Sequence, residues 1–482
     1  MQDAAIRIAE LEQELAKKIE QLEQQRQRIE QQCQQIEQLK EVVAQLRERL
    51  DRNSGNSSLP PSSDSPEARQ SKRNKSKNAK KRRKRGGQPG HRGNSRELLP
   101  PEQVDHIEDL FPDLCENCWS KLPKTPDEQP QRYQVTEVPP ITAKTTEYRQ
   151  HSVGCPCCGH ETRAQLPQEI AASPFGPRLS SIIVMLTGVY HLSRRQAQKV
   201  LSDLLSIQIS LGAISAVERR VSEALEPAWQ QAFDSVQQAE VKHTDGTSWR
   251  QAGKALQLWT VATALVTVFK VVADGSGPTL RLVLGKLKGV LISDRAKALN
   301  FWTMKRRQVC WAHLLRKFVS FFERDGPASG FGEQLLEYTS IVFDTYHTYK
   351  AGQITRKEFR RRMQPVREQF EALMQRAVDA DIKRLSGSCA DILLHREALW
   401  AFVDRDGIEP TNNHAERELR AFVLWRKRSF GSQSDRGNLF AERIMTVVHT
   451  ARKQDRHVLS YLTSVCEAWR CGQPAPLLLA NC

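Results

Sequence analysis

The region from Ala239 to Gly326 alternates between strand-like and helix-like patterns, and this alternation constrains the fold more than any other feature. Three runs rich in β-branched and aromatic residues come first, at 239–250, 255–265 and 266–275. The segments "PTLRLVLGKLK", "RAKALNFW" and "LLRKFVSFFERDG" then read as helices, with "GVLISD" and "RRQVCWAH" as strands between them. The order β-β-β-α-β-α-β-α predicts a mixed α/β layer that begins with an antiparallel meander.

The rest of the chain divides around this layer into segments of different composition. Residues 321–400 are rich in Arg and Glu and lack a strand pattern, so we expect a helical insertion there, with the α/β layer resuming at Asn412. We predict a multidomain α+β protein with six parts: a coiled coil (1–50), a basic linker without regular structure (51–96), a zinc-binding domain (97–165), a helix-turn-helix-like unit (172–228), the α/β domain (236–432) and a helical tail (433–482).

The N-terminal segment contains neither proline nor glycine from residue 4 to residue 50 and carries an apolar residue at every seventh position. These positions are Ile8, Leu15, Leu22, Ile29, Ile36, Val43 and Leu50. A strict seven-residue period predicts a left-handed coiled coil. The companion seam is polar at Lys18, Gln25 and Gln32, which indicates a homo-oligomer of moderate stability; the alternative is a helix that packs on its own chain.

A run from Arg69 to Arg85 holds eleven Lys and Arg residues and no acid, and it supplies most of the net charge of +16. The preceding stretch is rich in Ser, Asn and Pro and cannot bury enough surface to fold. Such concentrated charge favours a polyanionic partner, most simply DNA, although a solubilising tail would have the same composition. We expect phosphate contacts from the end of the run, at Lys80, Lys81, Arg82, Arg83, Lys84 and Arg85.

Two Cys-x-x-Cys pairs, Cys115 with Cys118 and Cys155 with Cys158, have 36 residues between them. Two such pairs can place four thiolates around one structural Zn²⁺ ion. The segment between the pairs alternates in a way that predicts two strands able to bring them together. Cys157 does not fit the spacing and is a bystander or an alternative ligand, and unrelated free cysteines remain the alternative for the whole set.

Two short helices within residues 172–228 form the predicted helix-turn-helix-like unit. Ser193 and Ser210 stand where N-caps of these helices would be. The second helix carries Arg219 and Arg220, which could contact DNA in that geometry. Any small helical bundle shows the same pattern, so a purely structural unit is the competing interpretation.

Three acids fall where the α/β layer would bring distant segments together. Asp245 lies in the first strand, Asp294 ends the strand after the first helix, and Glu416 opens the helix after the insertion. In a ribonuclease-H-like sheet the first and fourth strands are parallel neighbours, and a later helix packs across their ends. Carboxylates gathered there can hold two Mg²⁺ ions, or Mn²⁺ in their place, for phosphodiester chemistry. Each acid also has a structural reading: a turn at Asp245–Gly246, a helix cap at Asp294, and an ion pair of Glu416 with Arg420.

Several motifs resemble those of insertion-sequence-66 family transposases, the large DDE-type subunit, over nearly the whole chain. The resemblance is carried by "NSGNSSLPPSSD", "GGQPGHRG", the two cysteine pairs, "HTDGTSW", "LISD", "CWAHLLRKF" and "NNHAERELR". It implies a ribonuclease-H-like catalytic domain with Asp245, Asp294 and Glu416 as its catalytic triad. The chain departs from the family at Gly246, where Glu is frequent, and at "RKRSF", which replaces a more usual Arg-Lys-Asn.

The same resemblance implies the reaction and the partners. The protein would cut the two ends of the insertion sequence, a mobile DNA element, and the freed 3′-hydroxyls would then attack target DNA. The partners would be the terminal inverted repeats, the target DNA and small accessory proteins of the same element. We expect Arg420, Arg426 and Lys427 to lie along the DNA phosphates, and His313 of "CWAH" to be structural rather than catalytic.

Two other functions fit these residues: a DNA-binding regulator without catalysis, and a structure-selective nuclease of the same fold. No secretory signal precedes Asp3, and the longest apolar run, 258–273, is broken by Lys270, so we expect no membrane span. Eleven cysteines in a chain of 482 residues suit a reducing compartment better than a disulfide framework. We therefore expect a bacterial cytoplasmic protein associated with the nucleoid.

Overall fold

The computed structural model describes residues 30, 32, 35, 40, 97–171, 173–286, 288–324 and 326–479. The four isolated positions are helical, but the predicted coiled coil and the basic linker otherwise lie outside the described residues. Between residues 97 and 479 the chain forms two compact units. We call residues 234–249 and 255–423 the sheet unit, and residues 97–233, 250–254 and 424–479 the helical unit.

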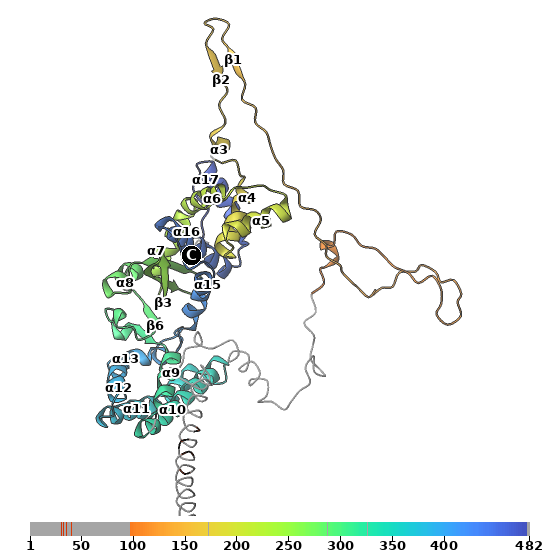
Figure 1. The fold of residues 1–482 in the computed structure, drawn as a ribbon. Coiled ribbons are helices and arrows are strands. Elements are labelled where there is room, and N and C mark those ends of the chain that lie inside the picture. Colours follow the sequence, from red (N-terminus) through yellow and green to blue (C-terminus); the bar gives the residue numbers. More distant parts are fainter. Residues whose placement is uncertain are drawn as a thin grey trace, which may run out of the picture. The chain divides into compact units, whose positions relative to one another are not determined.

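A five-stranded mixed sheet organises the sheet unit, with the strand order β5-β4-β3-β6-β7 (Figure 1). The strands are β3 (Val241–Gln251), β4 (Lys254–Ala262), β5 (Thr267–Val272), β6 (Val290–Ser293) and β7 (Arg307–Val309). β6 runs parallel to both β3 and β7, whereas β4 and β5 are antiparallel. The sheet is therefore mixed, as the alternating sequence pattern predicts.

The short strand β6 lies between β3 and β7, and all four of its residues are buried. A continuous apolar run such as Val290–Leu291–Ile292 is typical of a parallel strand that is covered on both faces. Gly289 precedes it with φ +74°, and a Cβ there would lie 2.4 Å from the Glu240 carbonyl oxygen. Glycine is thus required where the chain enters the strand beside β3.

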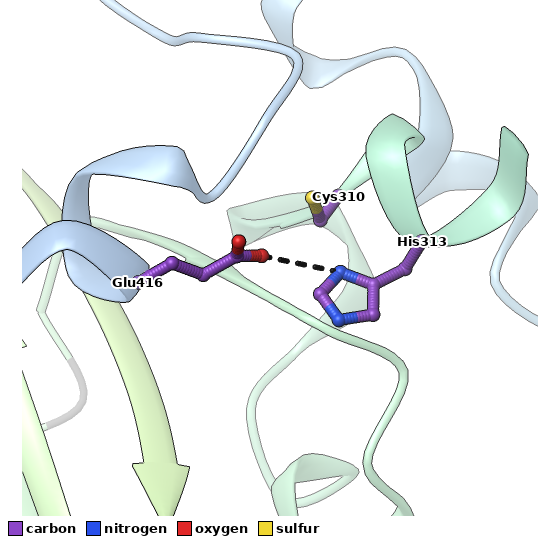
Figure 2. A group of neighbouring side chains, drawn as sticks. All are labelled: Cys310, His313 and Glu416. Atoms are coloured by element: carbon purple, nitrogen blue, oxygen red, sulfur yellow. Dashed lines mark ion pairs between the residues drawn. The ribbon is translucent and has the colours of Figure 1, made fainter. Parts of the chain in front are cut away.

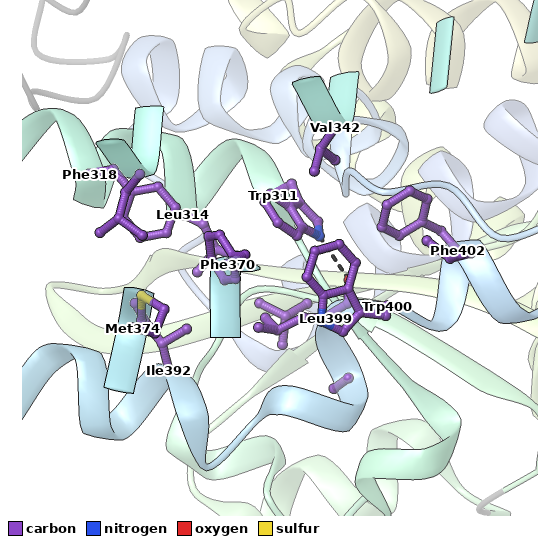
Figure 3. Packing of buried hydrophobic residues seen from close by; sticks show 14 of the residues in the cluster. Trp311, Leu314, Phe318, Val342, Phe370, Met374, Ile392, Leu399, Trp400 and Phe402 are labelled. Atoms are coloured by element: carbon purple, nitrogen blue, oxygen red, sulfur yellow. Dashed lines mark hydrogen bonds between the residues drawn. The ribbon is translucent and has the colours of Figure 1, made fainter. Parts of the chain in front are cut away.

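Helices cover the sheet and build the insertion. Around the sheet are α8 (Gly277–Leu284), α9 (Trp311–Phe322) and α15 (Asn413–Ser429). The insertion consists of α10 (Pro327–Lys350), α11 (Arg356–Asp379), α12 (Ser386–Leu393), α13 (Arg396–Leu399) and α14 (Ala401–Asp404). The insertion packs on α9 through one buried cluster, in which Trp311 and Phe318 of α9 meet Phe370 and Trp400 of the insertion (Figure 3). The Trp311 indole N–H also donates to the Leu399 carbonyl oxygen at 2.8 Å, so the insertion fixes α9 against the sheet.

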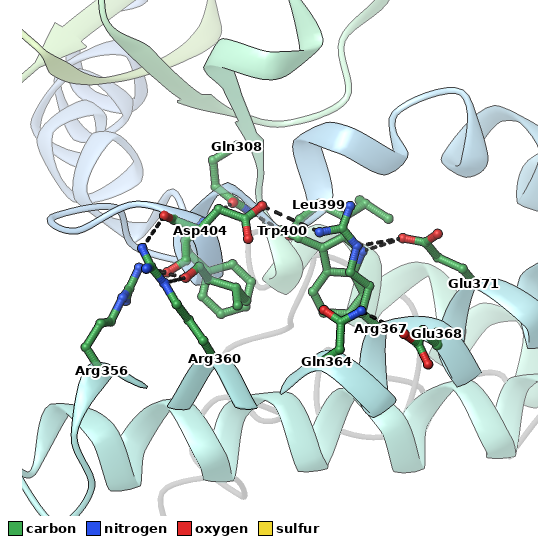
Figure 4. Close-up of polar contacts among 12 residues, drawn as sticks. Gln308, Arg356, Arg360, Gln364, Arg367, Glu368, Glu371, Leu399, Trp400 and Asp404 are labelled. Atoms are coloured by element: carbon green, nitrogen blue, oxygen red, sulfur yellow. Dashed lines mark hydrogen bonds and ion pairs between the residues drawn. The ribbon is translucent and has the colours of Figure 1, made fainter. Parts of the chain in front are cut away.

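The arginines of α11 are bound within the insertion itself (Figure 4). Arg356 donates to the carbonyl oxygens of Phe402 and Val403, and Arg360 donates to that of Asp404. These oxygens lie at the end of α14, where the helix leaves its last carbonyls without intrahelical partners. The positive charge of this segment is therefore used in folding.

The strand expected over residues 306–313 is limited to Arg307–Val309, because helix α9 begins at Trp311. Two other predictions of local structure are wrong. The first is a helix over residues 295–302, where a single 3₁₀ turn forms at Lys297–Leu299. The buried guanidinium of Arg307 donates to the carbonyl oxygens of Asp294 and Ala296, which a helix would use for its own hydrogen bonds. The carboxylate of Asp294 in turn accepts the Ala296 backbone N–H at 3.0 Å, a local bond that competes with helix formation.

The second wrong prediction is the pair of strands between the two Cys-x-x-Cys pairs. Residues 131–151 contain no regular structure, and Pro139 and Pro140 within them remove two backbone donors that a ladder would need. The observed hairpin instead joins β1 (Ser152–Gly154) to β2 (Glu161–Arg163), on either side of the second cysteine pair.

The helical unit combines two predicted segments in one core. Its helices are α3 (Gln168–Ala171), α4 (Pro177–Val184), the π-helix Met185–Val189, α5 (Arg194–Leu205), α6 (Leu211–Ala224), most of α7 (Glu226–Gln238), α16 (Asp435–Lys453) and α17 (Val458–Arg470). Ser193 and Ser210 cap α5 and α6 as predicted. The C-terminal helices α16 and α17 pack against α6 and α4, so the tail completes the core of the preceding helices. Within the described residues, no helix has the length and apolarity needed to span a membrane.

Candidate active site

The register of the central strands places two of the predicted acids side by side. β3 pairs with β6 in parallel through Val241 with Val290 and His243 with Ile292. Extended by two residues along both strands, beyond the last paired residues, the same register would set Asp245 opposite Asp294, which directly follows β6. Neighbouring strands lie about 5 Å apart, and residues at equivalent positions point to the same face. Two acids that are 49 residues apart in the sequence thus end at one edge of the sheet.

A short buried segment brings the third acid to this edge. The Asn412 side chain donates to the Thr244 carbonyl oxygen at 2.8 Å, and its backbone N–H donates to Cys310 Sγ at 3.1 Å. The backbone N–H of Trp311 donates to the Pro410 carbonyl oxygen at 2.9 Å. These bonds attach the start of α15 to the first half of β3 and to the start of α9. Glu416, on the first turn of α15, is positioned by that attachment.

The buried carboxyl of Asp245 lies close enough to Asp294 and Glu416 to be affected by their charges, although the three acids do not together form one of the clusters of potential metal ligands found in the described residues. The pKa of Asp245 is raised to about 7, first by burial and then by the negative charges of Asp294 and Glu416. The Gly246 backbone N–H and the Arg316 guanidinium act in the opposite direction but do not offset these effects. Burial and nearby negative charge thus disfavour the ionised form of Asp245, so a cation beside it would be stabilising.

Glu416 also belongs to a second group that the sequence did not indicate, with Cys310 and His313 (Figure 2). His313 Nδ1 lies 3.7 Å from Glu416 Oε1, and one donor atom from each of the three residues falls within 4.8 Å of the others. His313 Nδ1 and Glu416 Oε1 are buried and have no hydrogen-bond partner among the described residues. The pKa of His313 is lowered by burial and by the nearby Arg316. His313 was expected to be purely structural, but it faces a predicted catalytic side chain.

The sequence of the chain was compared with those of known protein families. A model of the transposase IS66 family matches residues 172–439, more than half of the chain. The chain belongs to the IS66 transposase family. This confirms the resemblance seen in the motifs and makes transposition of DNA the general role of the protein. Residues 1–97 match a family of unknown function, DUF6444. A search of curated proteins found no match to the chain.

A cation-lined cavity adjoins the acids of this transposase and was missed in the sequence. It is open to solvent, measures about 560 Å³, and is lined by Asp294, Arg295, Ala296, His313, Arg316, Lys317 and Ser320. Four of these residues follow a helical period along α9, at positions i, i+3, i+4 and i+7. Their common spacing within "CWAHLLRKFVS" was the signal that could have identified them before the structure.

The predicted DNA-contacting residues differ in their surroundings. Arg420 and Lys427 are exposed on α15, and Arg426 is half-buried. In α6, Arg219 is exposed, whereas Arg220 is half-buried and donates to Ser173 Oγ at 3.1 Å. Burial lowers the pKa of Arg220, so this residue has an internal role that its neighbour lacks. The six basic residues of 80–85 lie outside the described part of the chain.

The four cysteines predicted to bind zinc form two separate turns. The Trp119 backbone N–H donates to the Cys115 carbonyl oxygen, and the Gly159 N–H donates to that of Cys155. The pKa of Cys118 is lowered, chiefly by its hydrogen bond with the Ser120 side chain. The pKa of Cys155 is lowered by backbone hydrogen bonds from Cys158 and Cys157. Among the described residues, the structure brings together the members of each pair but not all four thiols in one group.

Proposed function

We propose that this IS66-family protein is a DDE-type polynucleotidyl transferase that cuts the ends of its element and joins their 3′-hydroxyls to target DNA. The proposal is carried by the effect of Asp294 and Glu416, which come from two other segments, on the buried Asp245, together with the parallel pairing of β3 with β6. In the sheet unit the first strand along the chain, β3, lies in the centre of the sheet and runs parallel to its neighbour β6. This strand order supports a ribonuclease-H-like arrangement. All three acids belong to the sheet unit, so one folded body supplies the whole triad.

The residues at this site fit divalent cations. Three carboxylates supply the oxygen ligands that Mg²⁺ and Mn²⁺ prefer. Burial and the charges of Asp294 and Glu416 disfavour ionised Asp245 when no cation is bound. We propose that Asp245, Asp294 and Glu416 hold two Mg²⁺ ions, or Mn²⁺ in their place. Bound there, such ions would activate the attacking oxygen and offset the charge of the leaving oxygen.

The chain's own residues contribute position and charge to this reaction. Asp245 and Asp294 are attached to adjacent strands, which fixes their separation, and the Asn412 bonds fix the helix that carries Glu416. Arg307 is fully buried, and its guanidinium donates a hydrogen bond of 2.8 Å to the Asp294 carbonyl oxygen, which fixes the backbone at that residue. Sites built on such supported elements keep catalytic groups in register better than sites on free loops.

The remaining parts would recognise and pair the DNA ends. We propose that the cysteine pairs bind one structural Zn²⁺, and that the zinc domain and the helical unit contact the terminal repeats. Further copies would join through the N-terminal coiled coil, and Lys80 to Arg85, Arg420, Arg426 and Lys427 would contact phosphates. We further propose that small accessory proteins of the same element assist the reaction. We place the protein in the bacterial cytoplasm, associated with the nucleoid.

A non-catalytic DNA-binding regulator and a structure-selective nuclease remain the competing functions, and one variant separates them. Asp245→Asn keeps the shape of the side chain but removes its charge. We expect it to abolish Mg²⁺-dependent cleavage and joining of element-end DNA while DNA affinity stays within about twofold, since the phosphate contacts that dominate affinity are retained. Wild-type protein that binds but never cuts under Mg²⁺ or Mn²⁺ would establish the regulator. Cleavage of branched DNA without strand joining would establish the nuclease.

The zinc proposal has its own test. Metal analysis of the purified full-length chain should give about one zinc per chain. The double variant Cys115→Ser, Cys118→Ser should lose it, whereas Cys157→Ser should keep it. Wild-type protein without zinc after expression in zinc-supplemented medium would remove this ion from the account.

A further inference from the structure

The cavity beside Asp294 contains more positive charge than the surrounding protein neutralises. Arg295 is the best paired of its cations, with Nη1 2.5 Å from Asp391 Oδ2. Arg316 reaches Glu416 Oε1 only at 4.0 Å. Lys317 forms no ion pair with any of the residues that the structure describes.

These cations are also partly withdrawn from water. The side chains of Arg295 and Arg316 are 21% and 25% exposed, and Lys317 is half-buried. The pKa of Lys317 is lowered by burial, then by the charges of Arg324 and Arg295. Arg324 Nη1 is itself buried without a hydrogen-bond partner among the described residues. Half-buried cations that repel each other are costly unless an anion joins them.

The lining also restricts the chemistry of that anion. Apart from the His313 ring it offers no aromatic face on which a nucleobase could stack. It does offer a planar guanidinium and an ammonium group, which suit the non-bridging oxygens of a phosphate. Because Asp294 belongs both to the cavity and to the acid group, whatever binds here lies next to the proposed reaction centre.

We infer that this cavity binds a backbone phosphate of the DNA strand, adjacent to the phosphate that is cut, with Arg316 and Lys317 as its principal donors. The inference rests on the proposed function, since it assigns to that site the neighbouring contact with its substrate. It would hold the strand so that the reacting phosphate falls among the three acids.

The test uses pyridoxal 5′-phosphate, whose aldehyde forms an imine with a lysine amine and is then fixed by borohydride reduction. Full-length Asp245→Asn protein is labelled either with this compound or with pyridoxal, which lacks the phosphate, and the labelled lysines are located by mass spectrometry. We expect Lys317 to be labelled several times more by the phosphate-bearing reagent. Inorganic phosphate and a short DNA duplex should each protect it, and Arg316→Gln should abolish the preference.

The outcomes separate this inference from the proposed function, because labelling requires no catalysis. Equal labelling of Lys317 by both reagents would overturn the inference even if the wild type cuts DNA. Protection by inorganic phosphate but not by DNA would reassign the cavity to a free phosphate compound and overturn it as well. Phosphate-dependent labelling with DNA protection would support it even if wild-type protein proves unable to cut.

A second measurement uses a matched charge change. The slope of log affinity against log salt is negative, and Lys317→Gln should make it shallower by about 0.9, the value for one lost phosphate contact. Lys305→Gln removes one exposed lysine from the same unit and should leave the slope unchanged. Equal slopes for Lys317→Gln and the wild type would contradict the assignment, provided that both proteins melt at the same temperature.

Discussion

The insertion and the sheet edge both concentrate charged side chains, but they use them in opposite ways. On α11, Arg356 and Arg360 donate to backbone carbonyl oxygens at the end of α14, and Arg367 pairs with Glu371 (Figure 4). At the sheet edge, Asp245 is destabilised as an anion by burial and then by the charges of Asp294 and Glu416. The arginines of the insertion are thus bound by carbonyl oxygens and carboxylates of the fold. The buried carboxylate at the sheet edge is fixed by the fold without enough positive charge around it to stabilise its ionised form.

The difference shows why the number of charged residues is a poor guide to function. The arginine-rich sequence of α11 alone would predict contact with DNA, yet Arg356, Arg360 and Arg367 bind groups of the insertion itself. At the sheet edge the positive charge near Asp245 does not offset its burial and the neighbouring acids. Unsatisfied like charges, fixed on strands and helix ends, are expected where a ligand completes the structure. The following predictions test whether the two regions differ in this way.

The largest expected effect is at the sheet edge. The folded Asp245 carboxyl keeps its proton up to about pH 7, whereas the unfolded one loses it near its ordinary pKa of 3.8. Between these values the folded state binds more protons, so wild-type stability falls as pH rises. In metal-free buffer, Asp245→Asn should therefore be more stable than the wild type, with a difference that grows from pH 4 to pH 7 to at most about 4 kcal/mol.

Denaturant unfolding of both proteins across this pH range checks the prediction. Added Mg²⁺ should stabilise the wild type and not the variant, because a cation that binds only the folded state shifts the equilibrium towards it. If the variant and the wild type unfold alike at every pH without metal, Asp245 does not stand among unsatisfied acids.

An intermediate effect is expected in the insertion, and it should have no counterpart in DNA binding. Arg356→Ala removes the side-chain donor to the carbonyl oxygens of Phe402 and Arg405, whereas the Val403 oxygen keeps Arg360 as a donor. Unsatisfied polar groups of this kind should lower stability by about 1–3 kcal/mol. DNA affinity and its salt dependence should stay unchanged in filter-binding or polarisation assays. A weakened, less salt-dependent affinity would show that this arginine meets phosphate after all.

The smallest effect is expected on the exposed face of the same helix. Glu358 accepts hydrogen bonds from Arg361 and Arg362, which lower its pKa to about 2. The pair is open to water, where such interactions are largely screened. Glu358→Gln should leave the melting temperature unchanged within error at neutral pH. A clear loss of stability would mean that the surface ion pairs of α11 matter as much as its carbonyl contacts.

Much of the architecture follows from local patterns. The strands β3 to β7, the caps at Ser193 and Ser210, and the helix that carries Glu416 all lie where periodicity and capping residues predict them. These features depend on neighbours in the sequence. The predicted helix after β6 fails because Arg307, which is buried on the next strand β7, binds the carbonyl oxygens that the helix would need.

The site was predictable only in part for the same reason. Three acids on suitable elements could be chosen from the sequence, but their convergence depends on the β3–β6 register and on the bonds of Asn412. The approach of His313 to Glu416 depends on the packing of α9 under the insertion. No spacing within a single motif contains that information, because the contacting residues are about one hundred positions apart.

The central claim is that three carboxylates from distant segments share one cation site, and iron-mediated cleavage tests it most directly. Fe²⁺ bound in place of Mg²⁺, with ascorbate and peroxide, produces radicals that cut the nearest backbone. We predict cuts close to residues 245, 294 and 416 in the same sample, all suppressed by excess Mg²⁺ and all lost in Asp245→Asn. Cuts near only one of these positions, or cuts that persist in the variant, would contradict the shared site.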